Sequence, residues 1–375
     1  MMAEHSPDES SGALRFAPQG GVLLKFLAIA GLLYLFILSI MLLGASFKLF
    51  GKEFAEAIFH STSNPVMGLM IGVLTTAIIQ SSSTTTSIVV GLVASGVLTF
   101  EGAIPMVMGA NIGTSITNII VSLGHLNREQ EFRRAFCGSM LHDFFNVCSV
   151  IVLLPLEIHF GLIRRSALSL GSLFSGFGGM TFTSPLKAVT KPVSSWILHT
   201  SGDSGLVGVI ISLLLLFVAL KYIVKVLRSL VLARVERFFQ TYVFRTPILA
   251  FLLGVAITAL VQSSSITTSI IVPLLGAGIL SYIQVYPYLL GANVGTTVTA
   301  FLASFVTGSP QAVSVAFAHL VFNIYGIAIF WPLKRIPIWL AVKLSDLTMK
   351  SKLVPIAYIL VVFFAIPGLI LYLME

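Results

Sequence analysis

The chain has 375 residues, of which 57% are hydrophobic and only 10% are charged, and its mean hydropathy is +1.00. A soluble domain carries about a quarter charged residues, so this composition excludes a water-soluble globular protein and predicts an all-α polytopic membrane protein. The net charge of +8 could indicate nucleic-acid binding. However, the basic residues stand at the ends of apolar runs, where they set membrane topology, so no nucleic-acid partner is expected.

The N-terminal part of the chain is predicted to hold a polar tail and one membrane span. Residues 1–21 are polar and of mixed character, which is typical of a disordered tail. Residues 22–47 form an apolar run about one bilayer thickness long, which is too long and too uninterrupted for a signal peptide. A short amphipathic connection at 51–64 follows this first transmembrane helix.

Residues 65–157 are predicted to form a first transport repeat, whose spans are short and interrupted. The apolar stretches break at the polar residues 80–83 and again at the glycine-containing segment 109–114. Interrupted spans at corresponding positions of two halves indicate a transport site. The backbone leaves the helix within a membrane only where protein buries it or where it lines a cavity. A helix over about 134–156 closes this repeat.

The rest of the chain is predicted to repeat this plan after a connection. Residues 158–204 lose clear periodicity and gather Gly, Ser and Thr, so we interpret them as an inter-repeat connection with interfacial helices. Residues 205–245 form a transmembrane helix followed by a basic cytoplasmic segment. Residues 246–335 form transport repeat 2, and residues 336–375 form a basic connection and the C-terminal transmembrane helix.

One phrase occurs in both repeats at a constant offset of 182 residues. Gln80-Ser81-Ser82-Ser83 corresponds to Gln262-Ser263-Ser264-Ser265, and 15 of the 25 positions from Gly72 to Gly96 are identical in the second copy. The same offset pairs Thr85, Thr86, Asn111 and Thr114 with Thr267, Thr268, Asn293 and Thr296. After a loop deletion in the second copy, His142 and Asn146 correspond to His319 and Asn323. Such self-similarity predicts a duplicated fold.

The basic residues predict opposite orientations of the two repeats. The basic segment at 221–237 should be cytoplasmic, and the pair at 334–335 brings the end of repeat 2 to the same side. The central loop of repeat 1, at 124–134, carries three arginines and should also be cytoplasmic, so the ends of repeat 1 should lie outside. The arginines at 164–165 fall outside in this scheme and count against it. Inverted repeats hold substrate and ion sites near the membrane midplane, between the halves.

The repeated polar residues have the chemistry of an ion and oxyanion site. Serine hydroxyls donate and accept hydrogen bonds, and each glutamine amide adds two donors and a carbonyl. A break at each motif would free backbone N–H groups at the start of the following half-helix, which favours an anion. Oxygen ligands suit a hard cation such as Na⁺. Residues 246–333 contain no Asp, Glu, Lys or Arg, so a cation there would need neutral oxygens or the anion's charge, which predicts coupled binding.

Other polar residues in the apolar runs admit two interpretations. His142 with Asn146, and His319 with Asn323, lie four residues apart on one helix face each. A structural hydrogen-bonded pair is favoured there over gating or substrate contact. Asp143 is either a functional intramembrane carboxylate or an internal partner of His142. Both cysteines are interpreted as free packing thiols, since their spacing fits neither a disulfide nor a metal site.

The paired motifs resemble the type II sodium–phosphate cotransporter family over roughly residues 65–367. The segments that carry the resemblance are the two Gln-Ser-Ser-Ser motifs, Ala103-Ile104-Pro105, Phe132-Arg133-Arg134-Ala135-Phe136 and His142-Asp143-Phe144-Phe145-Asn146. The resemblance implies uptake of inorganic phosphate by alternating access, with Na⁺ as the coupling ion, no organic cofactor and no enzymatic activity. It implies phosphate binding by Gln80, Ser81, Ser82, Ser83, Gln262, Ser263, Ser264 and Ser265. It implies sodium binding by Gln80, Ser83, Thr85, Thr86, Asn111, Thr114, Gln262, Ser265, Thr267, Thr268, Asn293 and Thr296.

Alternative functions and the location of the protein follow from smaller features. The short loops predict a bacterial protein of the inner membrane. A Na⁺ symporter of another oxyanion such as sulfate is one alternative, and a passive ion pore is another, since hydroxyl rings and half-helices also build filters. An intramembrane serine hydrolase is disfavoured because the serines come in runs without a Gly-x-Ser-x-Gly motif. The sequence leaves open the ratio of Na⁺ to phosphate and the oligomeric state.

Overall fold

The computed structural model describes residues 22–50, 62–176, 185–242 and 246–374. In these ranges all regular secondary structure is helical. Seven of the described helices are long and apolar enough to cross a membrane: Leu27–Leu49, Phe100–Leu123, Glu129–Phe160, Gly205–Tyr222, Tyr282–Thr307, Pro310–Phe330 and Val354–Met374. The prediction of an all-α polytopic membrane protein is confirmed. The predicted disordered tail at 1–21 and most of the predicted connection at 51–64 lie outside the described residues.

The first half of the chain begins with one long helix, and shorter helices and a second long helix follow it. They are α1 (Val22–Leu49), α3 (Pro65–Ile79), α4 (Ser82–Ser95), α5 (Phe100–Gly113), α6 (Ser115–Leu123) and α7 (Glu129–Phe160). The connection between the repeats forms α8 (Leu162–Gly176) and α9 (Pro185–Thr200), and the long α10 (Gly205–Tyr242) follows.

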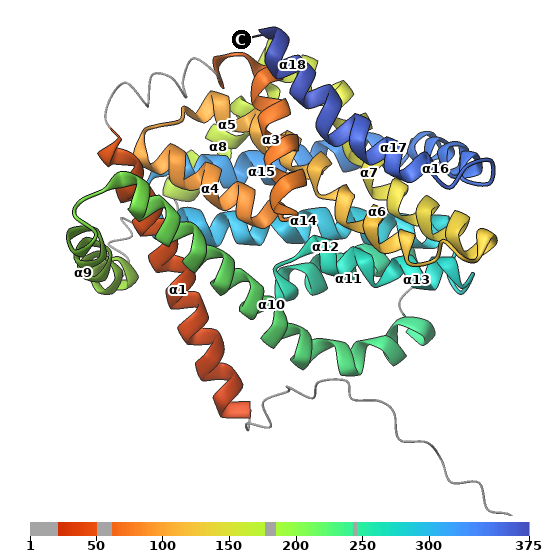
Figure 1. Ribbon diagram of the computed structural model, residues 1–375, viewed down its shortest axis with the longest axis horizontal. Coiled ribbons are helices and arrows are strands. Elements are labelled where there is room, and N and C mark those ends of the chain that lie inside the picture. Colours follow the sequence, from red (N-terminus) through yellow and green to blue (C-terminus); the bar gives the residue numbers. More distant parts are fainter. Residues whose placement is uncertain (1–21, 51–61, 177–184, 243–245, 375) are drawn as a thin grey trace, which may run out of the picture.

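The second half contains the same succession of short and long helices. These are α11 (Pro247–Val261), α12 (Ser264–Ser269), α13 (Ile271–Gly276), α14 (Tyr282–Thr307) and α15 (Pro310–Phe330). The basic connection forms α16 (Arg335–Leu347). The last span consists of α17 (Val354–Leu360), a π-helical turn (Val361–Ala365) and α18 (Ile366–Met374). In Figure 1, α14 crosses the middle of the molecule in contact with α4, α7, α11 and α15, while α1 and α10 lie side by side at the periphery.

Each repeat opens with a pair of helices too short to cross a bilayer. Helices α3 and α11 each have 15 residues, or about 22 Å at the rise of an α-helix, against a hydrocarbon core of about 30 Å. Asn64 caps α3 and Thr246 caps α11. In both helices a proline occupies the first turn, where a backbone N–H would have no acceptor within the helix. The chain then breaks after Ile79 and after Val261 and starts a new helix. The serine motifs therefore sit at true breaks, as the sequence predicted.

The second predicted interruption, at residues 109–114, is wrong. Helices α5 and α6 join at Thr114, whose φ of −60° and ψ of −30° are helical, and α14 runs without a break through the equivalent residues 291–296. The glycines here serve packing. A Cβ on Gly109 would lie 2.1 Å from the carbonyl oxygen of Leu69, and one on Gly72 would lie 2.1 Å from that of Met106. The equivalent distances in repeat 2 are 2.0 Å from Gly291 to Phe251 O and 2.2 Å from Gly254 to Tyr288 O.

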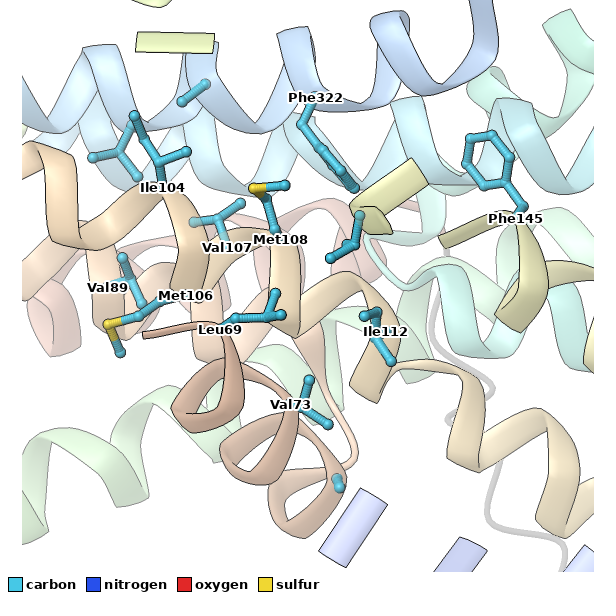
Figure 2. Close-up of a cluster of buried hydrophobic side chains, with 14 of the residues drawn as sticks. Leu69, Val73, Val89, Ile104, Met106, Val107, Met108, Ile112, Phe145 and Phe322 are labelled. Carbon is cyan, nitrogen blue, oxygen red and sulfur yellow. The ribbon is translucent and has the colours of Figure 1, made fainter. Parts of the chain in front are cut away.

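This close packing of α3 on α5 is surrounded by a buried apolar cluster. The side chains labelled in Figure 2 are Leu69, Val73, Val89, Ile104, Met106, Val107, Met108 and Ile112 from α3, α4 and α5, Phe145 from α7 and Phe322 from α15. Because α7 and α15 close the two repeats, the cluster joins elements from both halves of the chain.

The two ends of the molecule are held by different contacts. At one end, the first turns of α7 meet the end of α13 and also α16: Arg134 Nε donates to Gly276 O over 2.8 Å, and Arg133 Nε donates to Asp346 Oδ1 over 2.7 Å. At the other end, the rings of Phe174 and Phe305 stack with centroids 5.5 Å apart. Helix α8 therefore lies beside the C-terminal end of α14.

Candidate functional site

The two serine motifs have the same backbone conformation. Gln80 (φ 57°, ψ 30°) and Gln262 (φ 58°, ψ 24°) are both left-handed, and Ser81 and Ser263 that follow are both extended. Asp203 is the one other non-glycine residue with positive φ among the described residues. A left-handed L-residue costs about 1–2 kcal/mol. Strain of this kind at two equivalent positions is typical of a functional site.

The first serine of each motif caps the helix that follows. Ser81 Oγ accepts from Thr84 N over 3.2 Å, and Ser263 Oγ accepts from Ile266 N over 3.4 Å. The next two serines of each motif, Ser82, Ser83, Ser264 and Ser265, are buried, and their side chains do not cap the helix that follows. Their hydroxyls are therefore available for other contacts. One of them links the repeats, because Ser83 Oγ donates to Gln262 O over 3.2 Å.

A cavity of about 300 Å³ lies between the two motifs. Its lining consists of Ser81, Ser83 and Thr84 from repeat 1, Gln262, Ser263 and Ile266 from repeat 2, and Phe217, Leu220 and Lys221 from α10. The structure thus brings four of the eight serine-motif residues to one cavity. Gln80, which is exposed, and the buried Ser82, Ser264 and Ser265 do not line it.

The threonines of the predicted sodium set bond mainly to the backbone of their own helices. The hydroxyls of Thr85, Thr86, Thr267 and Thr268 donate to the carbonyls of the residues four positions earlier, at 2.6–3.1 Å. Thr114 and Thr296 do the same, at 2.9 Å each. Such bonds are common for hydroxyls in membrane helices, and they leave the oxygen lone pairs as acceptors. None of these six residues lines the cavity.

Asn111 and Asn293 belong to a polar network that joins the repeats apart from the cavity. His142 Nε2 lies 2.5 Å from Asn293 Oδ1, and His319 Nε2 lies 3.4 Å from Asn111 Oδ1. Asn146 Nδ2 donates to Asn111 O over 2.9 Å, while its Oδ1 accepts from Asn293 Nδ2 over 2.8 Å. The predicted pairing of His142 with Asn146 on one helix face is wrong, since both bond across to other helices. Because all five side chains are buried, this network satisfies groups that would be costly to leave unpaired.

Two contacts of the serine motifs involve residues that sequence reasoning missed. Asn118 Oδ1 accepts from Thr268 and from Ser269, at 2.9 Å each, which ties α6 to α12. Thr299 Oγ1 donates to Gln262 Oε1 over 2.8 Å. A sequence signal for both residues existed, because Asn118 and Thr299 lie one helical turn beyond Thr114 and Thr296, on the same face.

The equivalent of the Gln262–Thr299 contact is not made in repeat 1. The offset of 182 pairs Thr299 with Thr117 and Gln262 with Gln80. Thr117 Oγ1 is buried and has no hydrogen-bond partner among the described residues, and Gln80 is exposed. The two halves thus share a sequence and differ in this contact.

The buried carboxylate of Asp143 bonds to the last span of the chain. Tyr358 of α17 donates its hydroxyl to Asp143 Oδ2, and Asp143 is fully buried. His142 faces Asn293 and Ser115, so the structure does not support an internal pair of Asp143 with His142. A buried carboxylate within an apolar helix remains a functional candidate.

We expect the Asp143–Tyr358 bond to anchor the C-terminal span. Tyr358→Phe removes the hydroxyl that donates to the buried Asp143 Oδ2, which should destabilise the protein by about 1–3 kcal/mol. Asp143→Asn in the same chain should recover part of this loss, because the remaining buried group is then uncharged. A double-mutant cycle of thermal unfolding in detergent measures the coupling. Additive effects of the two substitutions would contradict the anchor.

Comparisons with known proteins agree on one family. The model of the Na⁺/Pi-cotransporter family matches residues 35–183 and 215–345. Sodium-dependent phosphate transport protein 2A of Rattus norvegicus is 34% identical over an alignment that covers 98% of this chain and 70% of the relative. The 2A protein of Ovis aries is 35% identical (94% and 68% covered), and the 2B protein of Homo sapiens is 32% identical (92% and 64% covered). No solved structure matches the chain.

Proposed function

Because the chain belongs to the Na⁺/Pi-cotransporter family, we propose that it is a secondary active transporter that takes up inorganic phosphate together with Na⁺. The observation that carries this proposal is the cavity of about 300 Å³ between the two serine motifs. Both copies of the repeated phrase reach it, and Ser83 and Gln262 join them across it. Transport without chemical conversion of the substrate accounts for these features, and we propose no enzymatic activity and no organic cofactor.

The proposed phosphate site uses neutral donors. Serine hydroxyls and the glutamine amide can donate to phosphate oxygens, and the start of α4 contributes the positive end of a 14-residue helix. We propose phosphate binding by Gln80, Ser81, Ser82, Ser83, Gln262, Ser263, Ser264 and Ser265. Four of these residues, Ser81, Ser83, Gln262 and Ser263, line the cavity.

The proposed sodium ligands are neutral oxygens. Residues 246–333 contain no carboxylate, so a cation held by this repeat would be stabilised by neutral oxygens and by the phosphate itself, which couples the two binding events. We propose sodium binding by Gln80, Ser83, Thr85, Thr86, Asn111, Thr114, Gln262, Ser265, Thr267, Thr268, Asn293 and Thr296. Of these, Asn111 and Asn293 would give up bonds to His319 and His142 in order to bind an ion.

We further propose that the two repeats are inverted and work by alternating access. The opposite charge distributions of the two repeats support the inversion, and reciprocal contacts support a two-fold relation, since His142 of repeat 1 meets Asn293 of repeat 2 and His319 of repeat 2 meets Asn111 of repeat 1. A two-fold axis produces such exchanged pairs. Equivalent regions of the two repeats also lie at different ends of the molecule. Gly276, at the end of α13 in repeat 2, accepts a hydrogen bond from Arg134, whereas Glu101, at the start of α5 in repeat 1, lies 4.0 Å from Arg164. We propose the inner membrane of a bacterium as the location.

Uptake of radiolabelled phosphate into proteoliposomes tests the proposal. Phosphate should accumulate above equilibrium when an inward Na⁺ gradient is present and should not do so with choline. Arsenate, a tetrahedral mimic of phosphate, should compete, and sulfate should not. Accumulation driven by protons alone would overturn the choice of Na⁺. Sulfate uptake would overturn the choice of phosphate, and Na⁺-independent current would indicate a pore.

A further inference from the structure

Lys221 is a charged residue at the cavity between the serine motifs, although it belongs to neither repeat. It lies on α10, and Phe217 and Leu220 of the same helix face line the cavity beside it. The sequence assigned Lys221 only to a basic segment that sets membrane topology. In the structure, its helix packs against α4 and α11, which flank the two motif breaks.

The charge of Lys221 is the only formal charge among the nine residues that line this cavity. No carboxylate forms an ion pair with Lys221 within the part of the chain that the structure describes. Repeat 2 supplies no charged side chain at all between residues 246 and 333. The cavity therefore combines hydrogen-bonding hydroxyls, an apolar wall from Phe217 and Leu220, and one cation without a described partner.

Such a lining suits an oxyanion better than hydroxyls alone would. A charge-assisted hydrogen bond from an ammonium to an anionic oxygen is about twice as strong as one between neutral groups. Apolar walls lower the local dielectric and strengthen this attraction. A lysine also offers three rotatable donors on a flexible stem, which can follow an anion as it moves.

From this geometry we infer that Lys221 is a binding residue for the phosphate anion in the cavity between the serine motifs. The inference rests on the proposed function and adds a recognition residue from outside the repeats. Lys221 sets the affinity for phosphate, whereas the affinity for Na⁺ depends on the oxygens of the repeats. The topology of α10 is maintained without Lys221, because the basic residues Lys225, Arg228, Arg234 and Arg237 follow it in the sequence.

The first experiment compares Lys221→Gln, Lys221→Arg and the wild type in proteoliposomes. Loss of one charge-assisted bond should raise the half-saturating phosphate concentration about tenfold in Lys221→Gln, with the half-saturating Na⁺ concentration unchanged when phosphate is saturating. Lys221→Arg should stay close to wild type, since it keeps the charge. Lys343→Gln on α16 is the matched control: it removes the same charge from another exposed helix position, away from the cavity.

A second experiment separates the charge from any effect of folding. In Lys221→Cys, aminoethyl methanethiosulfonate attaches a primary ammonium to the new thiol, and sulfonatoethyl methanethiosulfonate attaches an anion. The ammonium should restore the phosphate affinity to within about twofold of wild type, the sulfonate should weaken it further, and phosphate should slow both modifications. The native Cys137 and Cys148 are buried, which limits background reaction.

The outcomes distinguish this inference from the proposed function. If the wild type shows no Na⁺-driven phosphate uptake, the proposed function is overturned. If the wild type transports phosphate and Lys221→Gln keeps the wild-type half-saturating phosphate concentration, the role of Lys221 alone is overturned. Equal effects of the two thiol reagents on Lys221→Cys would likewise overturn it, because a binding charge must distinguish an ammonium from a sulfonate.

Discussion

Replacing Ser82 and Ser83 together by alanine is expected to reduce Na⁺-driven phosphate uptake by about a hundredfold or more. The two substitutions remove two hydrogen bonds to the anion, each worth about 1.5 kcal/mol, and their sum corresponds to a factor of about a hundred. The variant should still fold, because Ser81 remains to cap α4 and the two substituted hydroxyls make no cap of their own. Ser264→Ala with Ser265→Ala in repeat 2 should have the same effect, since Ser263 keeps its cap there.

The matched control for these variants is a pair of buried serines that serve only their own helices. Ser122 Oγ donates to Ile119 O over 2.6 Å, and Ser139 Oγ donates to Phe136 O over 2.7 Å. Ser122→Ala with Ser139→Ala should therefore transport nearly as well as wild type. Uptake is measured in proteoliposomes with the amount of folded protein matched. Wild-type rates in either motif variant would refute the assignment of these serines.

Substituting Gly72 by alanine is expected to prevent normal folding of the protein. The new Cβ would lie 2.1 Å from the carbonyl oxygen of Met106 and 2.9 Å from its carbonyl carbon. These are backbone atoms of α5, so relief requires the two helices to separate, which should cost about 3 kcal/mol or more. We expect a low yield of monodisperse protein in detergent and a lower Tm for what remains. The effect should act on stability first, because Gly72 does not line the cavity.

The same substitution at two other glycines provides the comparison. A Cβ on Gly31 or on Gly368 meets nothing within 4 Å, so Gly31→Ala and Gly368→Ala should leave yield and Tm unchanged, or raise them slightly through the better helix propensity of alanine. Gly254→Ala tests the second repeat, where the Cβ would lie 2.2 Å from Tyr288 O. A stable Gly72→Ala protein would contradict the close packing of α3 on α5.

The local parts of this fold could be predicted from the sequence. Composition gave the membrane class, and the repeated phrase gave the duplication and the breaks after Ile79 and Val261. The prediction of an interruption at residues 109–114 was wrong because a glycine can play either of two structural roles. It can break a helix or let another helix come close, and the packing partner decides between them. That partner, α3, is not visible in the local pattern.

The contacts between distant elements could not be predicted. His142 meets Asn293 across 151 positions of sequence, and Asp143 meets Tyr358 across 215. The hydrogen-bonding groups of these residues made them candidates for a polar contact. Several other residues at the correct helix spacing could have served equally well as hydrogen-bond partners. Lys221 shows a related limit. The positive charge of Lys221 at the end of an apolar run is fully explained by its role in setting membrane topology. Only the packing of α10 against α4 and α11 brings Lys221 to the cavity.

The unequal contacts of Gln262 and Gln80 bear on the energy of the transport cycle. Gln262 is held by Thr299, whereas Thr117, the equivalent of Thr299, has no described partner and Gln80 is exposed. In the proposed alternating-access cycle, an exchange of the two conformations would break this hydrogen bond in one half and form the equivalent bond in the other. The two end states are then nearly equal in energy for this contact, whatever the strength of the bond. In such a balanced pair of states, a modest difference in ligand binding is enough to shift the population. Under the proposed mechanism, duplication of the sequence would thus let an ion gradient set the direction of transport without a large energy difference between the two states to overcome.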